Sequence, residues 1–141
     1  GEQVSISSIL LERNFVWIGL DEFITAERPQ FNVGGLFRFN RKNEWIRFDN
    51  YRGLTGNGIY DLERTGNYIW ASLYQFGKET KETYGRGIVL INRINNKVIP
   101  INDERIPKTV NKIFFDGTYL WLGTENGLIK INFFNQLAQW R

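Results

Sequence analysis

Carboxylates are the side chains of this sequence best suited to acid–base chemistry. The chain of 141 residues contains no histidine and no cysteine, so the commonest general base, the commonest metal ligand and every thiolate are missing. The acidic residues in predicted loops are Asp21, Glu22, Glu27, Glu79 and Glu82. No spacing among them marks a catalytic pair, because pairing across distant segments cannot be read from a sequence. We therefore predict a protein without catalytic residues, metal site or cofactor.

A second set of residues suits recognition. Aromatic side chains supply rigid contact area, and arginine and tyrosine supply directed hydrogen bonds. Such residues gather in segments 21–34 and 74–86, and in the shorter segments 50–58 and 102–109. The candidate ligand-binding residues are Phe23, Arg28, Phe31, Tyr51, Arg52, Tyr74, Phe76, Lys78, Lys81, Tyr84 and Arg86. An alternative stays open, in which these segments only pack on one another as solvated connections.

Three tryptophans indicate which elements position these segments. Trp17, Trp70 and Trp121 are spaced 53 and 51 residues apart. An aliphatic residue lies eight positions before each of them, at Ile9, Leu62 and Ile113. After each tryptophan comes a strand that begins with Gly and ends with Asn, at 35–40, 87–92 and 127–132, and then a closing apolar stretch at 44–48, 97–101 and 136–140. The chain thus contains three repeats of four short strands.

The repeat length predicts the architecture. From the tryptophan to the Gly of the third strand there are 18, 17 and 6 residues, so the first two repeats hold insertions of 12 and 11 residues between their second and third strands. Without the insertions the periods are 41 and 40, within the roughly 40–50 residues of a four-stranded propeller blade. We predict an all-β, single-domain β-propeller segment covering 1–141, with antiparallel blades at about 4–49, 57–101 and 109–141. Three blades would be half of a closed ring.

This arrangement assigns places to the repeated residues. Trp17, Trp70 and Trp121 should pack between blades as structural core. Ser8, Asp61 and Lys112, on the first strand of each repeat, are candidates to line a central channel. Both insertions occupy the same point of the repeat, so we expect them to lie at one end of the blades together with 50–58 and 102–109.

The segments 52–73 and 106–132 resemble the two-component regulator propeller repeat. The resemblance rests on "FVWIGL" (15–20), "LWLGT" (120–124) and "ENGLIKIN" (125–132), and it covers about 110 of the 141 residues. It implies an extracytoplasmic, periplasmic sensor region that binds sugars or other ligands. The sequence is also, more weakly, similar to streptogramin-lyase-like propellers. We do not expect their lyase activity, because the chemistry of those propellers depends on a histidine and this sequence has none.

Composition narrows the partners. The net charge is +3 with scattered Lys and Arg, which argues against nucleic acid. No stretch approaches the ~18 apolar residues of a membrane span, so no membrane insertion is predicted. The chain has no methionine, which indicates a trimmed or mature part of a longer protein. Closed propellers have about four to eight blades, so we expect a homodimer or the remainder of a larger propeller to complete the ring.

Three functions stay open at this point. The leading one is a recognition or sensing module that binds a glycan or a protein through the inserted segments. The second is a structural segment that completes a propeller with another copy or with the rest of its parent protein. The third is a glycan-acting hydrolase or lyase.

Overall fold

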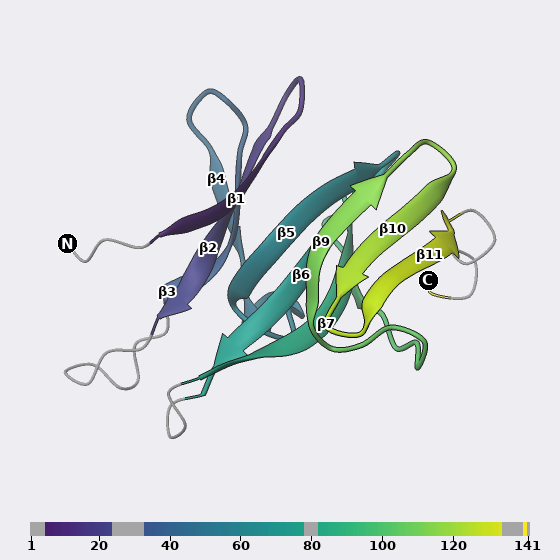
Figure 1. Cartoon of the computed structure of the whole chain (residues 1–141). Coiled ribbons are helices and arrows are strands. Elements are labelled where there is room, and N and C mark those ends of the chain that lie inside the picture. The colour runs from purple at the N-terminus through teal and green to yellow at the C-terminus, as the bar shows by residue number, and fades with distance from the viewer. Residues whose placement is uncertain (1–4, 24–32, 78–81, 134–139, 141) are drawn as a thin grey trace.

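The protein is all-β, as predicted, and its strands form three antiparallel sheets (Figure 1). The computed structural model describes residues 5–23, 33–77, 82–133 and 140. Sheet 1 contains β1 (Ile6–Leu11), β2 (Val16–Phe23), β3 (Val33–Phe39) and β4 (Trp45–Phe48). Sheet 2 contains β5 (Gly58–Thr65), β6 (Tyr68–Phe76), β7 (Thr83–Asn92) and β8 (Val98–Pro100). Sheet 3 contains β9 (Val110–Phe115), β10 (Tyr119–Thr124) and β11 (Gly127–Asn132), and a short 3-10 helix, η1 (Asn50–Arg52), links the first two sheets.

The sheets follow one another in the order of the chain. Within each sheet, strands that are neighbours in sequence pair with each other, and β1 is not paired with β11 in any described ladder. Across the described residues, no helix combines the length and the apolar character that crossing a membrane requires.

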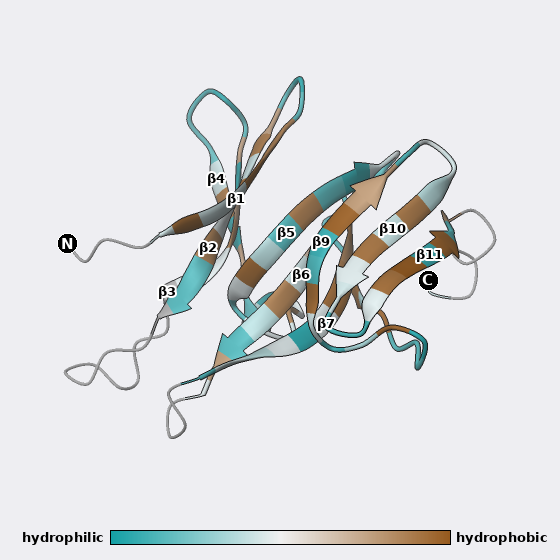
Figure 2. Ribbon diagram, in the orientation of Figure 1, coloured by the Kyte–Doolittle hydropathy of each residue, from teal (hydrophilic) through white to brown (hydrophobic). Residues whose placement is uncertain are grey.

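Each sheet has two different faces, because successive side chains of a strand point to opposite sides of the sheet. Bands of strongly hydrophobic residues recur along the strands in Figure 2. The Trp face carries Trp17, Trp70 or Trp121. The aliphatic face carries the residue eight positions earlier. The Trp face of sheet 1 packs on the aliphatic face of sheet 2 in one buried cluster, and the Trp face of sheet 2 packs on the aliphatic face of sheet 3 in another. Sheet 2 is therefore covered on both sides, which is why most of β6 and β7 is buried.

The first strand of each sheet contains the same irregularity. The register shifts between Ile6 and Ser8 in β1, between Ile59 and Asp61 in β5, and between Val110 and Lys112 in β9. All three shifts bracket the position ten residues before the tryptophan. A bulge bends a strand and increases its twist, so the three sheets are shaped alike at this point.

Each of the three tryptophans makes the same kind of hydrogen bond, which could not be predicted from the sequence. Each indole Nε1–H donates to the side chain five residues earlier: Trp17 to Glu12 at 2.7 Å, Trp70 to Thr65 at 2.7 Å, and Trp121 to Asp116 at 2.8 Å. The bond ties the second strand to the turn that precedes it, and it satisfies the polar atom of a buried indole.

The third strand of each sheet contains a Gly and is followed by or ends at an Asn, and these two residues have different roles. Gly35 has φ +97°, and a Cβ there would lie 2.6 Å from the carbonyl oxygen of Phe48. Asn40 accepts backbone hydrogen bonds from residues 42, 43 and 44, and Asn92 accepts them from Ile94 and Asn95. The Asn side chains thus close the turns into the fourth strands of sheets 1 and 2.

In sheet 3, one expectation falls almost entirely outside the described residues and another needs correction. The closing strand expected at 136–140 lies outside the described residues except for Trp140, which has helical rather than extended backbone and packs edge-on against Trp70. Trp121 is only half-buried, whereas Trp17 and Trp70 are completely buried. The reason is that no sheet among the described residues packs on the Trp face of sheet 3.

Candidate functional site

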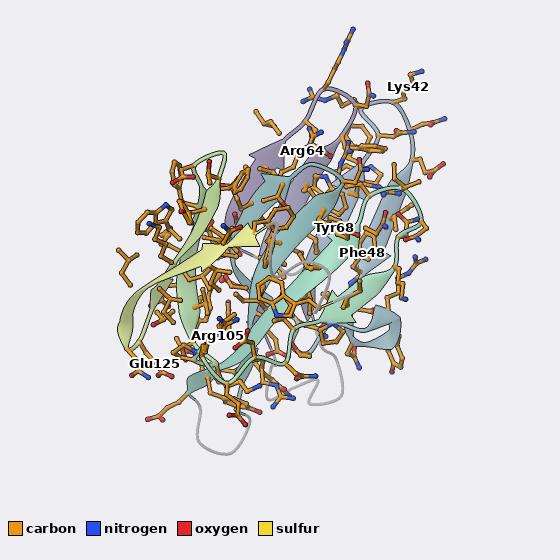
Figure 3. All side chains as sticks on the ribbon, turned by 90° about the vertical axis from the view of Figure 1, so that its right-hand side faces the viewer. Lys42, Phe48, Arg64, Tyr68, Arg105 and Glu125 are labelled. Carbon is orange, nitrogen blue, oxygen red and sulfur yellow. The ribbon has the colours of Figure 1, made fainter. Side chains whose placement is uncertain are left out.

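The inserted segments begin and end at one end of the sheets, here called the insertion end. It contains the last residues of β2, β6 and β10 and the first residues of β3, β7 and β11. The opposite end, the turn end, contains the β1–β2 and β3–β4 turns and their counterparts in sheet 2. Figure 3 shows the separation, with Lys42 and Arg64 toward one end and Glu125 and Arg105 toward the other.

The second inserted segment is mostly strand, which corrects the prediction of a loop at 74–86. β6 continues to Phe76 and β7 begins at Thr83, and these two residues pair. Tyr74 pairs with Gly85 after a register shift. Aromatic residues and threonine favour extended structure, so the insertion lengthens the hairpin.

Tyr74 joins the two inserted segments at their base. Its side chain is buried, its ring contacts Tyr60 with centroids 4.4 Å apart, and its hydroxyl donates to the Asp21 carboxylate of sheet 1. Burial, with the neighbouring Asp21 carboxylate adding to it, raises the pKa of the Tyr74 phenol well above its ordinary value. The buried Glu22 carboxylate accepts the backbone N–H of Phe76. Asp21 and Glu22 therefore hold two sheets together.

The connections between sheets meet the same end. The Thr55 hydroxyl donates to the carbonyl of Arg86 at 2.8 Å, and Arg86 Nε donates to the carbonyl of Thr55 at 2.9 Å. Gly35 N–H donates to the carbonyl of Asn57, and Gly87 N–H donates to that of Lys108 at 2.8 Å. Each inter-sheet connection is thus bonded to the hairpin beside it.

A polar pocket of about 190 Å³ opens at this end between sheets 1 and 2. Its lining residues are Glu22, Asn50, Thr55, Gly56, Asn57 and Gln75. The Asn57 side chain is buried and exchanges two hydrogen bonds with Asn50, so the pocket wall is fixed. Amide, hydroxyl and carboxylate groups together can donate to and accept from a small polar ligand.

The predicted binding residues are distributed unevenly around this pocket. Tyr51, which follows the pocket residue Asn50, has 91% of its surface exposed. Arg52 is exposed with its guanidinium 5.7 Å from the Phe48 ring centroid, Phe76 is half-buried, and Tyr84 is exposed on β7. Phe23 ends β2, and nothing is described of its side chain; Arg28, Phe31, Lys78 and Lys81 lie outside the described residues. The prediction missed Asn50, Thr55, Asn57 and Gln75. The polar run "NYRGLTGNG" (50–58) was the available signal for three of them.

The channel candidates have separate environments. The Asp61 carboxylate accepts the N–H of Ile113 at 2.8 Å, and the nearby Glu63 carboxylate accepts the N–H of Phe115 at 3.1 Å. Ser8 is half-buried on β1, and Lys112 is exposed on the Trp face of sheet 3. Asp61 thus links sheet 2 to the first strand of sheet 3.

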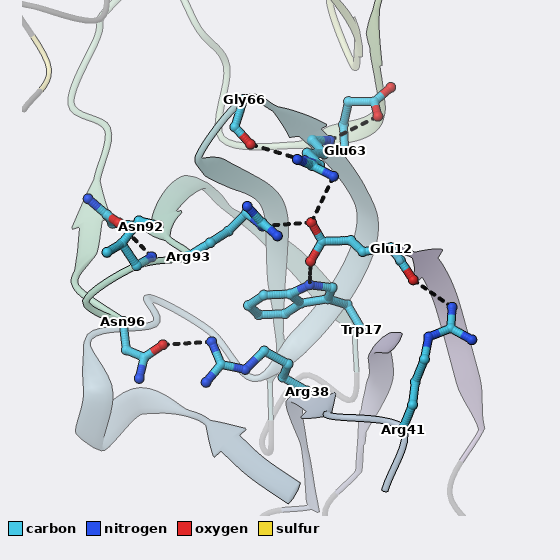
Figure 4. Close-up of polar contacts among 11 residues, drawn as sticks. Glu12, Trp17, Arg38, Arg41, Glu63, Gly66, Asn92, Arg93 and Asn96 are labelled. Atoms are coloured by element: carbon cyan, nitrogen blue, oxygen red, sulfur yellow. Dashed lines mark hydrogen bonds and ion pairs between the residues drawn. The ribbon is translucent and has the colours of Figure 1, made fainter. Parts of the chain in front are cut away.

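A buried ion cluster occupies the turn end between sheets 1 and 2 (Figure 4). The Glu12 carboxylate, which also accepts from Trp17, lies 2.6 Å from Arg93 Nε and 3.1 Å from Arg64 Nη1. Arg38 donates to Asn96 at 2.7 Å. Because Arg64, Arg93 and Asn96 belong to sheet 2, the cluster joins the two sheets.

A second pocket, of about 360 Å³, lies beside this cluster on sheet 1. It is lined by Arg13, Asn14, Phe15, Asn40, Arg41 and Lys42, from the β1–β2 and β3–β4 turns. The prediction had placed no site at the turn end. The basic residues Arg13, Arg41 and Lys42, all in turns between strands, were the feature of the sequence from which this pocket could have been predicted.

The first two acidic residues of the insertion end have structural partners. The described residues contain no group of three or more acidic side chains that could hold a metal ion. Asp21 and Glu22 both accept hydrogen bonds from sheet 2, so each has a structural task. Comparison with models of protein families, with curated proteins and with solved structures finds no match for this chain.

Proposed function

We propose that the three sheets are blades of a β-propeller related to the two-component regulator propeller repeat. Three features support the proposal: the bulge, the indole hydrogen bond and the positive-φ Gly. Each of them recurs at an equivalent position in all three sheets. The proposal is also supported by the packing of Trp face on aliphatic face, which is used twice. Repeated units that bury their faces against neighbours are typical of propellers.

The chain acts in this proposal as a non-catalytic recognition module that binds a glycan at the insertion end. The observation that carries it is the polar pocket of about 190 Å³, built from three segments that meet there. This volume is below the roughly 300–1,000 Å³ of pockets for drug-sized ligands, so it suits one sugar unit rather than a cofactor. Tyr51, exposed next to Asn50, offers an aromatic surface at the rim.

A binding titration tests this function. Calorimetry of the full chain would use a panel of soluble oligosaccharides: cello-, xylo-, manno-, chito- and galacturono-hexaose. We expect at least one to bind, and Gln75→Ala and Tyr51→Ala to weaken that binding about tenfold or more, as expected when a polar partner or a stacking surface is lost. Ile94→Ala, at an exposed residue of the turn end, is the matched control. No binder in the panel, or unchanged affinity in both variants, rejects the glycan assignment.

A structural role is the second candidate, because a specific observation favours it. No described sheet covers the aliphatic face of sheet 1 or the Trp face of sheet 3, where Ile9 is 58% exposed and Leu128 is 69% exposed. Faces of this kind are buried wherever two sheets of this chain meet. Another copy, or further repeats of a longer protein, would complete the propeller by covering them.

A further inference from the structure

The two faces that no described sheet covers are complementary in kind. The aliphatic face of sheet 1 presents Ile9, Leu11, Ile18, Phe37, Phe39 and Trp45, and the ring of Trp45 contacts those of Phe37 and Phe39. The Trp face of sheet 3 presents Phe114, Tyr119, Trp121, Leu128 and Lys130. Inside the chain, an aliphatic face is covered each time by the Trp face of the preceding sheet. Among the described residues, one face of each kind is left without a partner sheet.

We propose that a second copy of this chain covers both faces, so that two chains form one closed ring of six sheets. This rests on the proposed propeller and names its partner. The Trp face of sheet 3 in each copy packs on the aliphatic face of sheet 1 in the other. Such a head-to-tail contact closes at two copies only if the rotation between neighbouring sheets completes a circle.

The indole of Trp121 is already oriented for this contact. It is held by Asp116 through the same five-residue hydrogen bond that holds Trp17 and Trp70 in the two internal interfaces. Covering the face therefore needs no rearrangement of this side chain, which lowers the entropy cost of association.

Lys130 gives the interface a cation whose partner can be inferred from the internal interface. The residue of sheet 1 at the equivalent position of the repeat is Arg38, which is buried against sheet 2. The Arg38 guanidinium lies 5.4 Å from the Trp17 ring centroid, and the Lys130 ammonium lies 5.4 Å from that of Trp121. A cation over the indole at this position is thus compatible with a covered face.

The partner of Arg38 indicates the partner of Lys130. Arg38 donates to Asn96, in the turn between the third and fourth strands of the following sheet. Asn96 precedes Lys97, whose carbonyl closes that turn, and Glu44 closes the corresponding turn of sheet 1. Asn43 is the counterpart of Asn96 in sheet 1, so a second copy would bring the Asn43 side chain to the ammonium of Lys130.

Sedimentation at micromolar concentration of the full chain tests the ring. We expect the wild type to have twice the 16.6 kDa mass of the chain. Ile18→Glu and Leu128→Lys each place a charge in an apolar contact and should raise Kd at least about 100-fold, leaving monomer. An equimolar mixture of the two variants should regain the dimer, because one interface is then unchanged and the other pairs Glu with Lys. Ile94→Glu, an exposed residue outside both faces, should remain dimeric.

A charge reversal covers the case in which these variants do not fold. Lys130→Glu should weaken the dimer, and Lys130→Glu combined with Asn43→Lys should restore it, because the two new charges then face each other in opposite signs. A monomeric wild type, a species larger than two copies, or a mixture that stays monomeric would overturn the proposal. The readout is mass, whereas the glycan assignment is read from oligosaccharide affinity, so either can fail alone.

Discussion

The indole Nε1–H of Trp70 donates a 2.7 Å hydrogen bond to the hydroxyl of Thr65, and both residues are buried between sheets 2 and 3. The ring meets Phe133 and Trp140 edge-on, with centroids 5.7 and 5.5 Å away. A single side chain thus joins a turn of sheet 2 to the segment that follows sheet 3.

Trp70→Ala is expected to lower the free energy of unfolding by about 3–5 kcal/mol, because it removes a fully buried ring between two sheets. Trp140→Ala should cost less, since Trp140 is only half-buried. Urea denaturation followed by circular dichroism measures both. Equal losses in the two variants would place Trp70 outside the core.

Glu12→Gln tests the ion cluster at the turn end. The amide can still accept from Trp17, but Arg64 and the largely buried Arg93 lose their carboxylate. We expect a loss of about 2–4 kcal/mol, the lower values reflecting the partial exposure of Arg64. Glu125→Gln, at an exposed turn, is the control in the same urea experiment. A loss no greater than that of the control contradicts the role given to Glu12.

Gly35→Ala should destabilise more than Gly117→Ala, although both positions have positive φ. A Cβ at Gly35 would meet the Phe48 carbonyl at 2.6 Å, whereas a Cβ at Gly117 has nothing within 4 Å. The steric term should separate the variants by about 1–2 kcal/mol in thermal unfolding. The opposite order would show that the third strand can shift to accept the methyl group.

Tyr74 should make the protein sensitive to alkali. Its folded pKa is raised, chiefly by burial and also by Asp21, whereas an unfolded tyrosine titrates near 10. Above about pH 10 the unfolded chain therefore binds fewer protons than the folded chain, and stability falls as pH rises. Urea midpoints measured from pH 8 to 11 should fall less steeply in Tyr74→Phe than in the wild type. Parallel curves would contradict the assignment.

Asp103 should contribute to stability only above acidic pH. The hydrogen bond from Arg105 lowers the pKa of Asp103 to about 2. The contribution is fully present above the unfolded value near 4 and is lost as pH falls through 2. Asp103→Asn should thus melt below the wild type at pH 6, and the difference should shrink toward pH 2. A constant difference across this range would show that Asp103 acts through its shape alone.

The sequence allowed much of the strand order to be predicted, because aligning three tryptophans placed the alternating strands around them. The start of the third strand at Gly35 or Gly87 could be expected, but not its bond to the carbonyl of the next connection. The pocket was missed because Glu22, Asn50 and Gln75 meet only after two sheets pack. The second insertion was read as a loop, because a strand pairing such as Phe76 with Thr83 depends on how a hairpin closes.

The stacking gives the chain a direction, because the two faces of each sheet are different and each packs only on the other kind. Every internal joint described joins the same pair of surfaces. Duplicating or deleting one sheet would still place a Trp face against an aliphatic face at the new interface. Such a gene can therefore gain or lose repeats without a new contact having to evolve first. The same property offers protein engineers a site for adding a unit: between Pro100 and Val110, where one sheet ends and the next begins.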